Sequence, residues 1–125
     1  MTEPVIAVVE DNPDNRLLVQ AILEDDYEIV EFDSGTAAME GLEAAGPDLV
    51  LLDISLPGMD GTDVLRWIRG RERLSDLPVV ALTAHAMAGD REKYLAAGFN
   101  DYVTKPIVDE AVLFEAIRRW LSPGS

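Results

Sequence analysis

Cysteine is absent from this sequence of 125 residues, which excludes a disulfide framework and any metal site built from thiolates. Long hydrophobic runs are absent too: none approaches the roughly 18 residues needed to span a bilayer. The first residues, MTEP, lack the basic and apolar regions of a signal peptide. Basic residues are few, since 10 Lys and Arg stand against 24 Asp and Glu, for a formal net charge of −14. That charge disfavours binding to a phosphate backbone, so we expect no direct binding to nucleic acids. From the lack of cysteine, of a signal peptide and of a membrane-spanning run, we expect a soluble cytoplasmic protein that does not bind membranes.

The apolar content is sufficient for one folded domain. Hydrophobic residues make up 48% of the chain, and its length is that of a single domain. We therefore expect one domain over residues 1–125.

Five short segments have the composition of β-strands. Val5–Val9, Leu49–Leu52 and Val79–Leu82 are uninterrupted apolar runs, typical of strands buried on both faces of a parallel sheet. Tyr27–Phe32 alternates glutamates with apolar residues, and Asp101–Thr104 is short and partly polar. We therefore expect these last two strands at the edges of the sheet.

A helix is predicted after each strand. The first begins at Asn12-Pro13, a capping side chain followed by a proline whose missing N–H costs nothing there. The fourth runs from Asp90 towards Gly98, which is suited to ending a helix. The positions predicted to face the core in the first, second, third and fifth helices are, in turn, Leu17, Leu18, Ala21 and Ile22; Ala37, Ala38 and Leu42; Val64, Leu65 and Ile68; and Leu113, Ala116, Ile117 and Trp120. Regular alternation of strand and helix predicts an α/β fold, a doubly wound five-stranded parallel sheet with five flanking helices.

Polar side chains follow four of the strands. Glu10 and Asp11 come after the first, Asp53 ends the third, Thr83 ends the fourth and Lys105 follows the fifth. Because the carboxyl ends of parallel strands share one edge of a sheet, where ligands bind in open α/β folds, we expect these groups to converge.

Three carboxylates crowded together repel one another and raise one another's pKa unless a cation lies among them. Only oxygen ligands are available, so Mg²⁺ fits best, with Mn²⁺ as a substitute. His85 is the only histidine, which does not favour a transition-metal site. With Mg²⁺ present, Asp53 could attack phosphorus as a nucleophile, Lys105 could neutralise phosphoryl charge, and Thr83 could donate a hydrogen bond to a phosphoryl oxygen.

This set of residues resembles the receiver domain of bacterial two-component response regulators. Glu10-Asp11, Asp53, Thr83 and Lys105-Pro106 match the family's motif in order and spacing. The segment LPGMDG resembles the loop after the family's phosphoacceptor, and Tyr102 matches its aromatic switch position. The run TAHAMAGDREKYLAAGFNDYVTKP looks especially like receivers of hybrid kinases and of the single-domain cell-division regulator DivK.

The resemblance implies a flavodoxin-like strand order, 2-1-3-4-5, as in chemotaxis receivers. It implies that Asp53 accepts a phosphoryl group from a histidine kinase or a histidine phosphotransfer protein. Asp11, Asp53 and the carbonyl oxygen of Ser55 would bind Mg²⁺, and Glu10 would act through a water molecule. Thr83 and Tyr102 would relay phosphorylation to protein targets that dock on the last helix–strand–helix face. The domain would then be a signalling phosphoacceptor that catalyses only its own phosphoryl transfer and slow dephosphorylation.

Two alternatives remain at this point. A phosphatase or phosphotransferase of the haloacid dehalogenase type also uses a carboxylate at the end of a parallel strand, but it needs a second acid where this chain has Ser55. A receiver that works without phosphorylation would bind partners through a fixed surface, which the complete set of motif residues argues against. A flavodoxin is disfavoured because Glu10 and Asp11 would repel a phosphate group.

Overall fold

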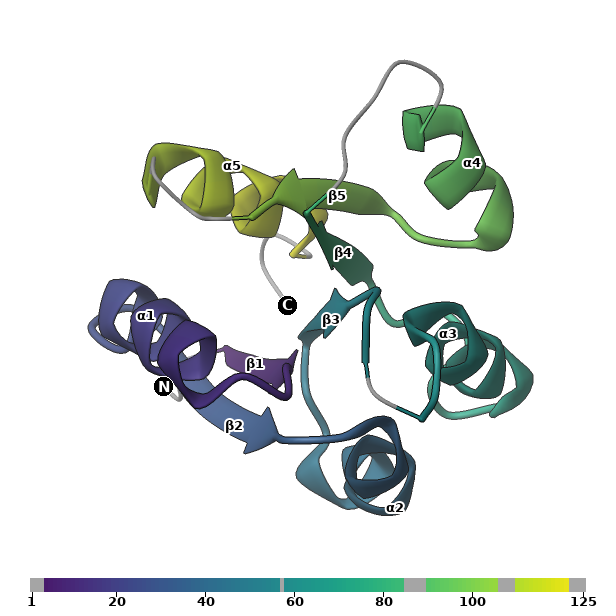
Figure 1. Ribbon diagram of the computed structural model, residues 1–125. Helices are drawn as coiled ribbons and strands as arrows, with labels where there is room; N and C mark the ends of the chain where they lie inside the picture. Colours follow the sequence, from purple (N-terminus) through teal and green to yellow (C-terminus); the bar gives the residue numbers. More distant parts are fainter. Residues whose placement is uncertain (1–3, 57, 85–89, 106–109, 122–125) are drawn as a thin grey trace.

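Five parallel strands form one central sheet in the computed structural model, which describes residues 4–56, 58–84, 90–105 and 110–121 (Figure 1). The strands are β1 (Val5–Val9), β2 (Glu28–Phe32), β3 (Leu49–Asp53), β4 (Val79–Thr83) and β5 (Asp101–Thr104). Their order in the sheet is β2-β1-β3-β4-β5, and all four neighbouring pairs are parallel. The predicted order 2-1-3-4-5 is therefore confirmed.

The register of the sheet sets the strand ends side by side. Val9 of β1 pairs with Leu52 of β3, and Asp53 pairs with Leu82 of β4. Thr83 in turn pairs with Thr104 of β5. Each polar residue that ends or follows a strand therefore reaches the same edge.

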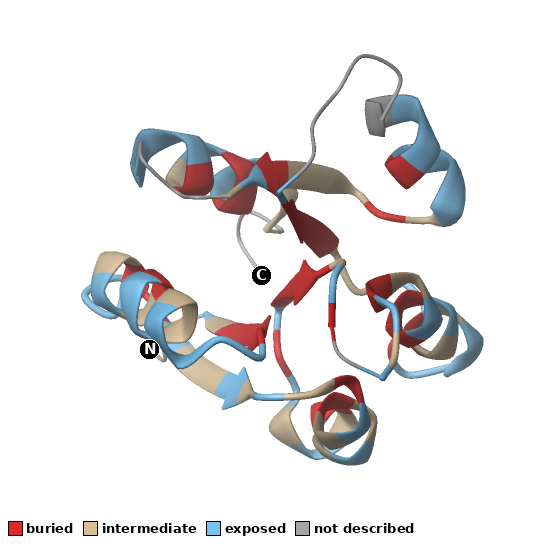
Figure 2. Cartoon of the chain, viewed as in Figure 1, coloured by how far each residue is buried: buried red, intermediate tan, exposed pale blue. Residues whose placement is uncertain are grey.

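Burial follows the predicted division between interior and edge strands (Figure 2). Every residue of β3 and β4 is buried, as are four of the five in β1. The edge strand β2 has only exposed and half-buried residues, because its outer side has no neighbouring strand. The apolar runs thus gave the correct interior strands.

Helices follow all five strands, with ends set by local capping. They are α1 (Pro13–Leu23), α2 (Gly35–Ala45), α3 (Gly61–Gly70), α4 (Asp90–Ala97) and α5 (Glu110–Trp120). The side chains of Asn12, Ser34 and Asp60 cap the first three helices by accepting backbone N–H groups that lack a helical partner. Gly46 ends α2 in the left-handed conformation that favours glycine. None of the helices in the described ranges is long and apolar enough to cross a membrane.

The helices cover both faces of the sheet. On one face, the residues buried against the strands come from α1 and α5: Val19, Leu23, Leu113, Ala116 and Ile117. On the other face they come from α2, α3 and α4: Ala38, Leu42, Val64, Leu65, Ile68 and Tyr94. This is the doubly wound arrangement that the sequence predicts.

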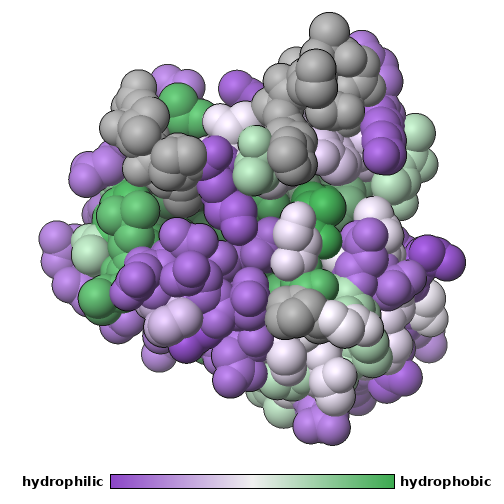
Figure 3. Space-filling model, in the orientation of Figure 1, coloured by the Kyte–Doolittle hydropathy of each residue, from purple (hydrophilic) through white to green (hydrophobic). Residues whose placement is uncertain are grey.

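The core-facing side of α1 differs from the prediction. Leu17 is 65% exposed and Leu18 41% exposed, and hydrophobic atoms lie over α1 on the molecular surface (Figure 3). Ala21 is exposed and Ile22 only partly buried, whereas Val19 and Leu23 are fully covered. The predicted stripe was wrong except at Ile22, because the covered face of α1 is centred on Val19 and Leu23, with the half-buried Asn15 and Arg16 on the same side. In α2, α3 and α5 the predicted core positions are buried or half-buried as expected.

Candidate functional site

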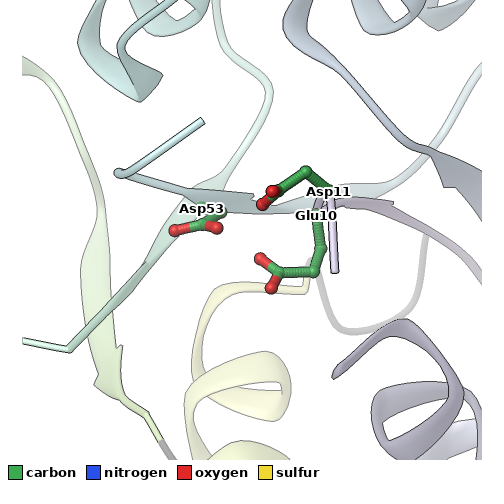
Figure 4. Close-up of side chains that lie close together, drawn as sticks. All are labelled: Glu10, Asp11 and Asp53. Atoms are coloured by element: carbon green, nitrogen blue, oxygen red, sulfur yellow. The ribbon is translucent and has the colours of Figure 1, made fainter. Parts of the chain in front are cut away.

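The carboxylates of Glu10, Asp11 and Asp53 point towards one another at the carboxyl edge of the sheet (Figure 4). One oxygen from each lies within 4.8 Å of the others. Glu10 and Asp53 are buried, while Asp11 is exposed. The predicted convergence is confirmed, and the exposed carboxylate leaves the cluster accessible from solvent.

Lys105 lies beside the two buried carboxylates. Its Nζ is 3.1 Å from Oδ2 of Asp53 and 3.4 Å from both carboxylate oxygens of Glu10. The lysine follows β5, two strands away from β3, and its backbone N–H donates to the carbonyl oxygen of Thr83. A single cation thus balances part of the charge of two buried acids, as buried charges require.

The pKa values of the two buried acids are shifted in opposite directions. Burial raises the pKa of Glu10 to about 7, and a hydrogen bond with Asp53 and the charge of Asp53 add to the rise. Burial also acts to raise the pKa of Asp53, but hydrogen bonds with Glu10, the Ser55 N–H and Lys105 outweigh it and lower the pKa. Asp53 therefore loses its proton at a lower pH than Glu10, and the ionised carboxylate is the form that a nucleophile needs.

Two residues of α1 support the cluster and were not predicted from the sequence. Nδ2 of Asn15 donates to Oε1 of Glu10 over 2.7 Å, and this bond acts to lower the pKa of Glu10. Nη1 of Arg16 donates to the carbonyl oxygens of Glu10 and Asp11 over 2.8 and 3.2 Å. The available signal was their place in the first helical turn after the Asn12 cap, directly above the end of β1. Asn15 and Arg16 lie on the same side of α1 as the buried Val19, and Leu17 and Leu18 lie on the exposed side.

The loop after β3 fixes the orientation of Asp53. The N–H of Ser55 donates to Oδ1 of Asp53 over 3.0 Å, so Oδ1 is held by the backbone and Oδ2 faces Lys105. The N–H of Gly61 donates to the carbonyl oxygen of Ile54 over 2.9 Å. A Cβ at Gly61 would lie 2.4 Å from the carbonyl oxygen of Asp53, so only glycine allows α3 to begin this close to the site. Pro57 lies outside the described residues.

Thr83 and Tyr102 lie on the side of the site formed by β4 and β5. Thr83 is buried, and its Oγ1 lies 3.1 Å from the hydroxyl of Tyr94 on α4. Tyr102 is half-buried, with its ring centroid 5.9 Å from that of Tyr94. Tyr94 was predicted only as a helical residue, so its contact with Thr83 is new. His85 and Pro106 fall outside the described residues.

The acid cluster has the donors that a hard divalent cation requires. Its three side chains offer only carboxylate oxygens, the ligand type preferred by Mg²⁺ and Mn²⁺. Two of these carboxylates are buried next to each other, and a cation bound there would compensate their repulsion. The carboxylates of Glu10, Asp11 and Asp53 therefore fit a magnesium ion.

Comparison with known proteins agrees with this site. The model of the response regulator receiver domain family matches residues 6–118. The histidine-protein kinase BarA of Escherichia coli K12 is 44% identical over 121 residues, which cover 96% of this chain but only 13% of the kinase. The sensor protein GacS of Pseudomonas syringae is also 44% identical over 121 residues, which cover 94% of this chain and 13% of GacS. The chain thus spans about an eighth of the length of these kinases.

Relatives of similar size cover almost the whole chain. The polar-differentiation response regulator DivK of Brucella ovis is 40% identical over 86% of this chain and 87% of its own. A crystal structure of the receiver domain of sensor histidine kinase PA1611 from Pseudomonas aeruginosa, with magnesium coordinated in its active-site cleft, has a TM-score of 0.85 and 38% identity over 95% of this chain. Chemotaxis protein CheY4 of Vibrio cholerae, at 22% identity and a TM-score of 0.88, shares the fold. The chain therefore belongs to the response regulator receiver domain family, the phosphoacceptor domains of two-component and phosphorelay signalling.

Proposed function

We propose that Asp53 is the phosphoacceptor and receives its phosphoryl group from the phosphohistidine of a histidine kinase or a histidine phosphotransfer protein. A carboxylate oxygen of Asp53 attacks phosphorus, the P–N bond breaks, and the imidazole leaves with the electron pair and takes up a proton. One observation carries the proposal: Asp53 is a buried carboxylate at a strand end, 3.1 Å from a lysine and within 4.8 Å of two further acids.

The acid side of the site would hold Mg²⁺, with Mn²⁺ as a substitute. The ligands we propose are the carboxylates of Asp11 and Asp53 and the carbonyl oxygen of Ser55, with Glu10 acting through a water molecule. The bound ion supplies positive charge against the negative charge of the phosphoryl oxygens. The magnesium in the PA1611 receiver and the all-oxygen donor set of this chain support the assignment.

Lys105 and Thr83 complete the proposed phosphoryl site. Lys105 contacts Oδ2 of Asp53, so its ammonium group would stabilise the negative charge that develops on the phosphoryl oxygens. Thr83 ends β4, the strand next to β3, and its hydroxyl would donate a hydrogen bond to one of these oxygens. With the phosphoryl group transferred to its own Asp53, the domain would catalyse only its own phosphorylation and slow dephosphorylation.

The output of the domain would be a change in protein–protein contacts. The proposed docking face consists of α4, β5 and α5, and Tyr102 on β5 is its proposed switch residue. Downstream targets would be proteins, since a net charge of −14 disfavours nucleic acids. We further propose that residues 1–125 form one receiver domain and that it functions in the cytoplasm, on its own or as part of a longer kinase such as those it resembles.

Intact mass after incubation with Mg²⁺ and acetyl phosphate tests the phosphoacceptor. We expect the parent to gain one phosphoryl group and Asp53→Asn to gain none, because the amide is nearly isosteric but is a poor nucleophile. Asp63→Asn is the matched control: Asp63 is an exposed aspartate in the first turn of α3 and should label like the parent. Equal labelling of Asp53→Asn and the parent would contradict the assignment, and repeated turnover of acetyl phosphate would favour a phosphatase.

A further inference from the structure

Tyr94 is the one buried side chain among residues 92–97 of α4. It is 8% exposed, whereas Glu92, Lys93 and Leu95 on the described part of α4 are exposed (Figure 2). Its hydroxyl reaches the end of β4 and forms a buried hydrogen bond of 3.1 Å with Oγ1 of Thr83. A bond across 11 residues of sequence thus ties α4 to the strand that carries the proposed phosphoryl-binding hydroxyl.

The ring of Tyr94 also contacts the aromatic residues that follow α4. Its centroid lies 6.1 Å from that of Phe99 in an edge-to-face pair and 5.9 Å from that of Tyr102 in a tilted pair. Such pairs fix relative ring positions, so a movement of the Tyr94 phenol changes the environment of both neighbours. Tyr94 therefore lies between Thr83 and the proposed switch residue.

The chemistry of a threonine hydroxyl links this bond to phosphorylation. A hydroxyl has one proton and donates it in one direction at a time. Either oxygen of the Thr83–Tyr94 pair can be the donor. When Thr83 is the donor, it must withdraw its proton from Tyr94 before it can donate to a phosphoryl oxygen on Asp53. In that arrangement Tyr94 and the phosphoryl oxygen compete for the same proton, and this is the arrangement that the inference assigns to the unphosphorylated domain.

We infer that Tyr94 is a positioning residue that holds the Thr83 hydroxyl on the α4 side, and that phosphorylation exchanges this bond for one to the phosphoryl group. The inference rests on the proposed role of Thr83. The exchange alters the hydrogen bonding of the buried tyrosine of α4 and releases α4 and Tyr102 to rearrange. The Tyr94 hydroxyl thereby sets how easily the domain reaches its phosphorylated conformation.

Titration with beryllofluoride, a phosphoryl mimic, at saturating Mg²⁺ tests this competition through amide chemical shifts. Tyr94→Phe removes the hydroxyl and keeps the ring contacts, so we expect it to bind beryllofluoride about fivefold more tightly, the typical effect of one net hydrogen bond. Its affinity for Mg²⁺ alone should equal that of the parent. Tyr27→Phe is the matched control, because Tyr27 is equally buried but packs on the opposite face of the sheet.

A second pair of variants shows whether the effect passes through Thr83. In the Thr83→Ala background, adding Tyr94→Phe should change the affinity for beryllofluoride by no more than Tyr27→Phe changes it in the parent. A gain that persists in that background would overturn the inference, as would equal or weaker binding by Tyr94→Phe while the parent binds normally. A parent that does not bind beryllofluoride would instead overturn the proposed function of the site.

Discussion

The site has two halves that are built differently. The acid half contains Glu10, Asp11, Asp53 and Lys105, joined by ion pairs and hydrogen bonds at the ends of β1, β3 and β5. The hydroxyl half contains Thr83, Tyr94 and Tyr102, which are neutral and meet through one hydrogen bond and a ring contact. The three acids lie at the ends of the buried strands β1 and β3, whereas the hydroxyl half includes Tyr94 from α4, whose other side chains are exposed at residues 92–97.

We propose that this difference separates the half that accepts the phosphoryl group from the half that responds to it. Buried charges lose their hydration, so Glu10 and Asp53 must each keep a partner, and their positions in the acid half are therefore fixed. Neutral hydroxyls exchange hydrogen-bond partners at little net cost, because the bonds lost and gained are similar in strength. A phosphoryl group made in the fixed half can thus be sensed by the half that rearranges.

Close packing against the backbone of β3 is the strongest constraint on the acid half. In Gly61→Ala, the added Cβ would lie 2.4 Å from the carbonyl oxygen of Asp53 and 2.8 Å from Cα of Ile54. Backbone atoms cannot move aside cheaply, so we expect a loss of about 3 kcal/mol in the free energy of unfolding, at the upper end of overpacking effects. Urea denaturation measures this loss.

Gly70→Ala is the control for that substitution. Gly70 ends the same helix, and a Cβ there would have no neighbour within 4 Å. We expect no loss of stability, or a small gain from a less flexible unfolded chain. Similar losses in both variants would show that the approach of α3 to Asp53 does not constrain the acid half.

The acid half was largely predictable from the sequence, for a physical reason. Apolar runs identify the buried strands, and parallel pairing brings their carboxyl ends to one edge. The residues that end those strands, such as Asp53 and Thr83, must then lie close together. The acid cluster therefore follows from patterns that are local in the sequence, whereas the order of the strands was implied only by the family resemblance.

Side chains from the helices were less predictable. In α1, Asn15 bonds Glu10 from the same side of the helix that buries Val19, and Leu17 and Leu18 lie outside although they are more hydrophobic than their polar neighbours. The bond between Tyr94 and Thr83 depends on how closely α4 packs on β4, which periodicity does not encode. In both cases the decisive contact joins a helix to a strand end.

The raised pKa of Glu10 should make the stability of the metal-free acid half depend on pH. Folded Glu10 keeps its proton up to a pH of about 7, whereas the unfolded side chain releases it near 4.5. The folded state binds more protons in this window, so stability falls as the pH rises through it, by at most about 3 kcal/mol. Melting temperatures in EDTA between pH 4.5 and 8 measure the fall.

Glu10→Gln should remove that fall, because glutamine does not titrate but can still donate to Asp53. Glu28→Gln, an exposed position on the edge strand β2, should keep the parent's slope. The lowered pKa of Asp53 acts in the opposite sense and only below about 3.8, outside this window. A parental slope in Glu10→Gln would assign the pH dependence to another group.

The smallest effect we expect is the stabilisation of the fold by Mg²⁺, which should depend on the acid half and not on the hydroxyl half. An ion that binds only the folded acid cluster stabilises the protein by RT ln(1 + [L]/Kd), about 1.4 kcal/mol at a tenfold excess over Kd. Asp11→Ala removes the exposed carboxylate of the cluster, so most of the rise in melting temperature with Mg²⁺ should disappear. Thr83→Ala should keep the full rise, because Thr83 belongs to the hydroxyl half. Loss of the response in Thr83→Ala would mean that the two halves are coupled before any phosphoryl group arrives, and a response that survives in Asp11→Ala would place the ion elsewhere.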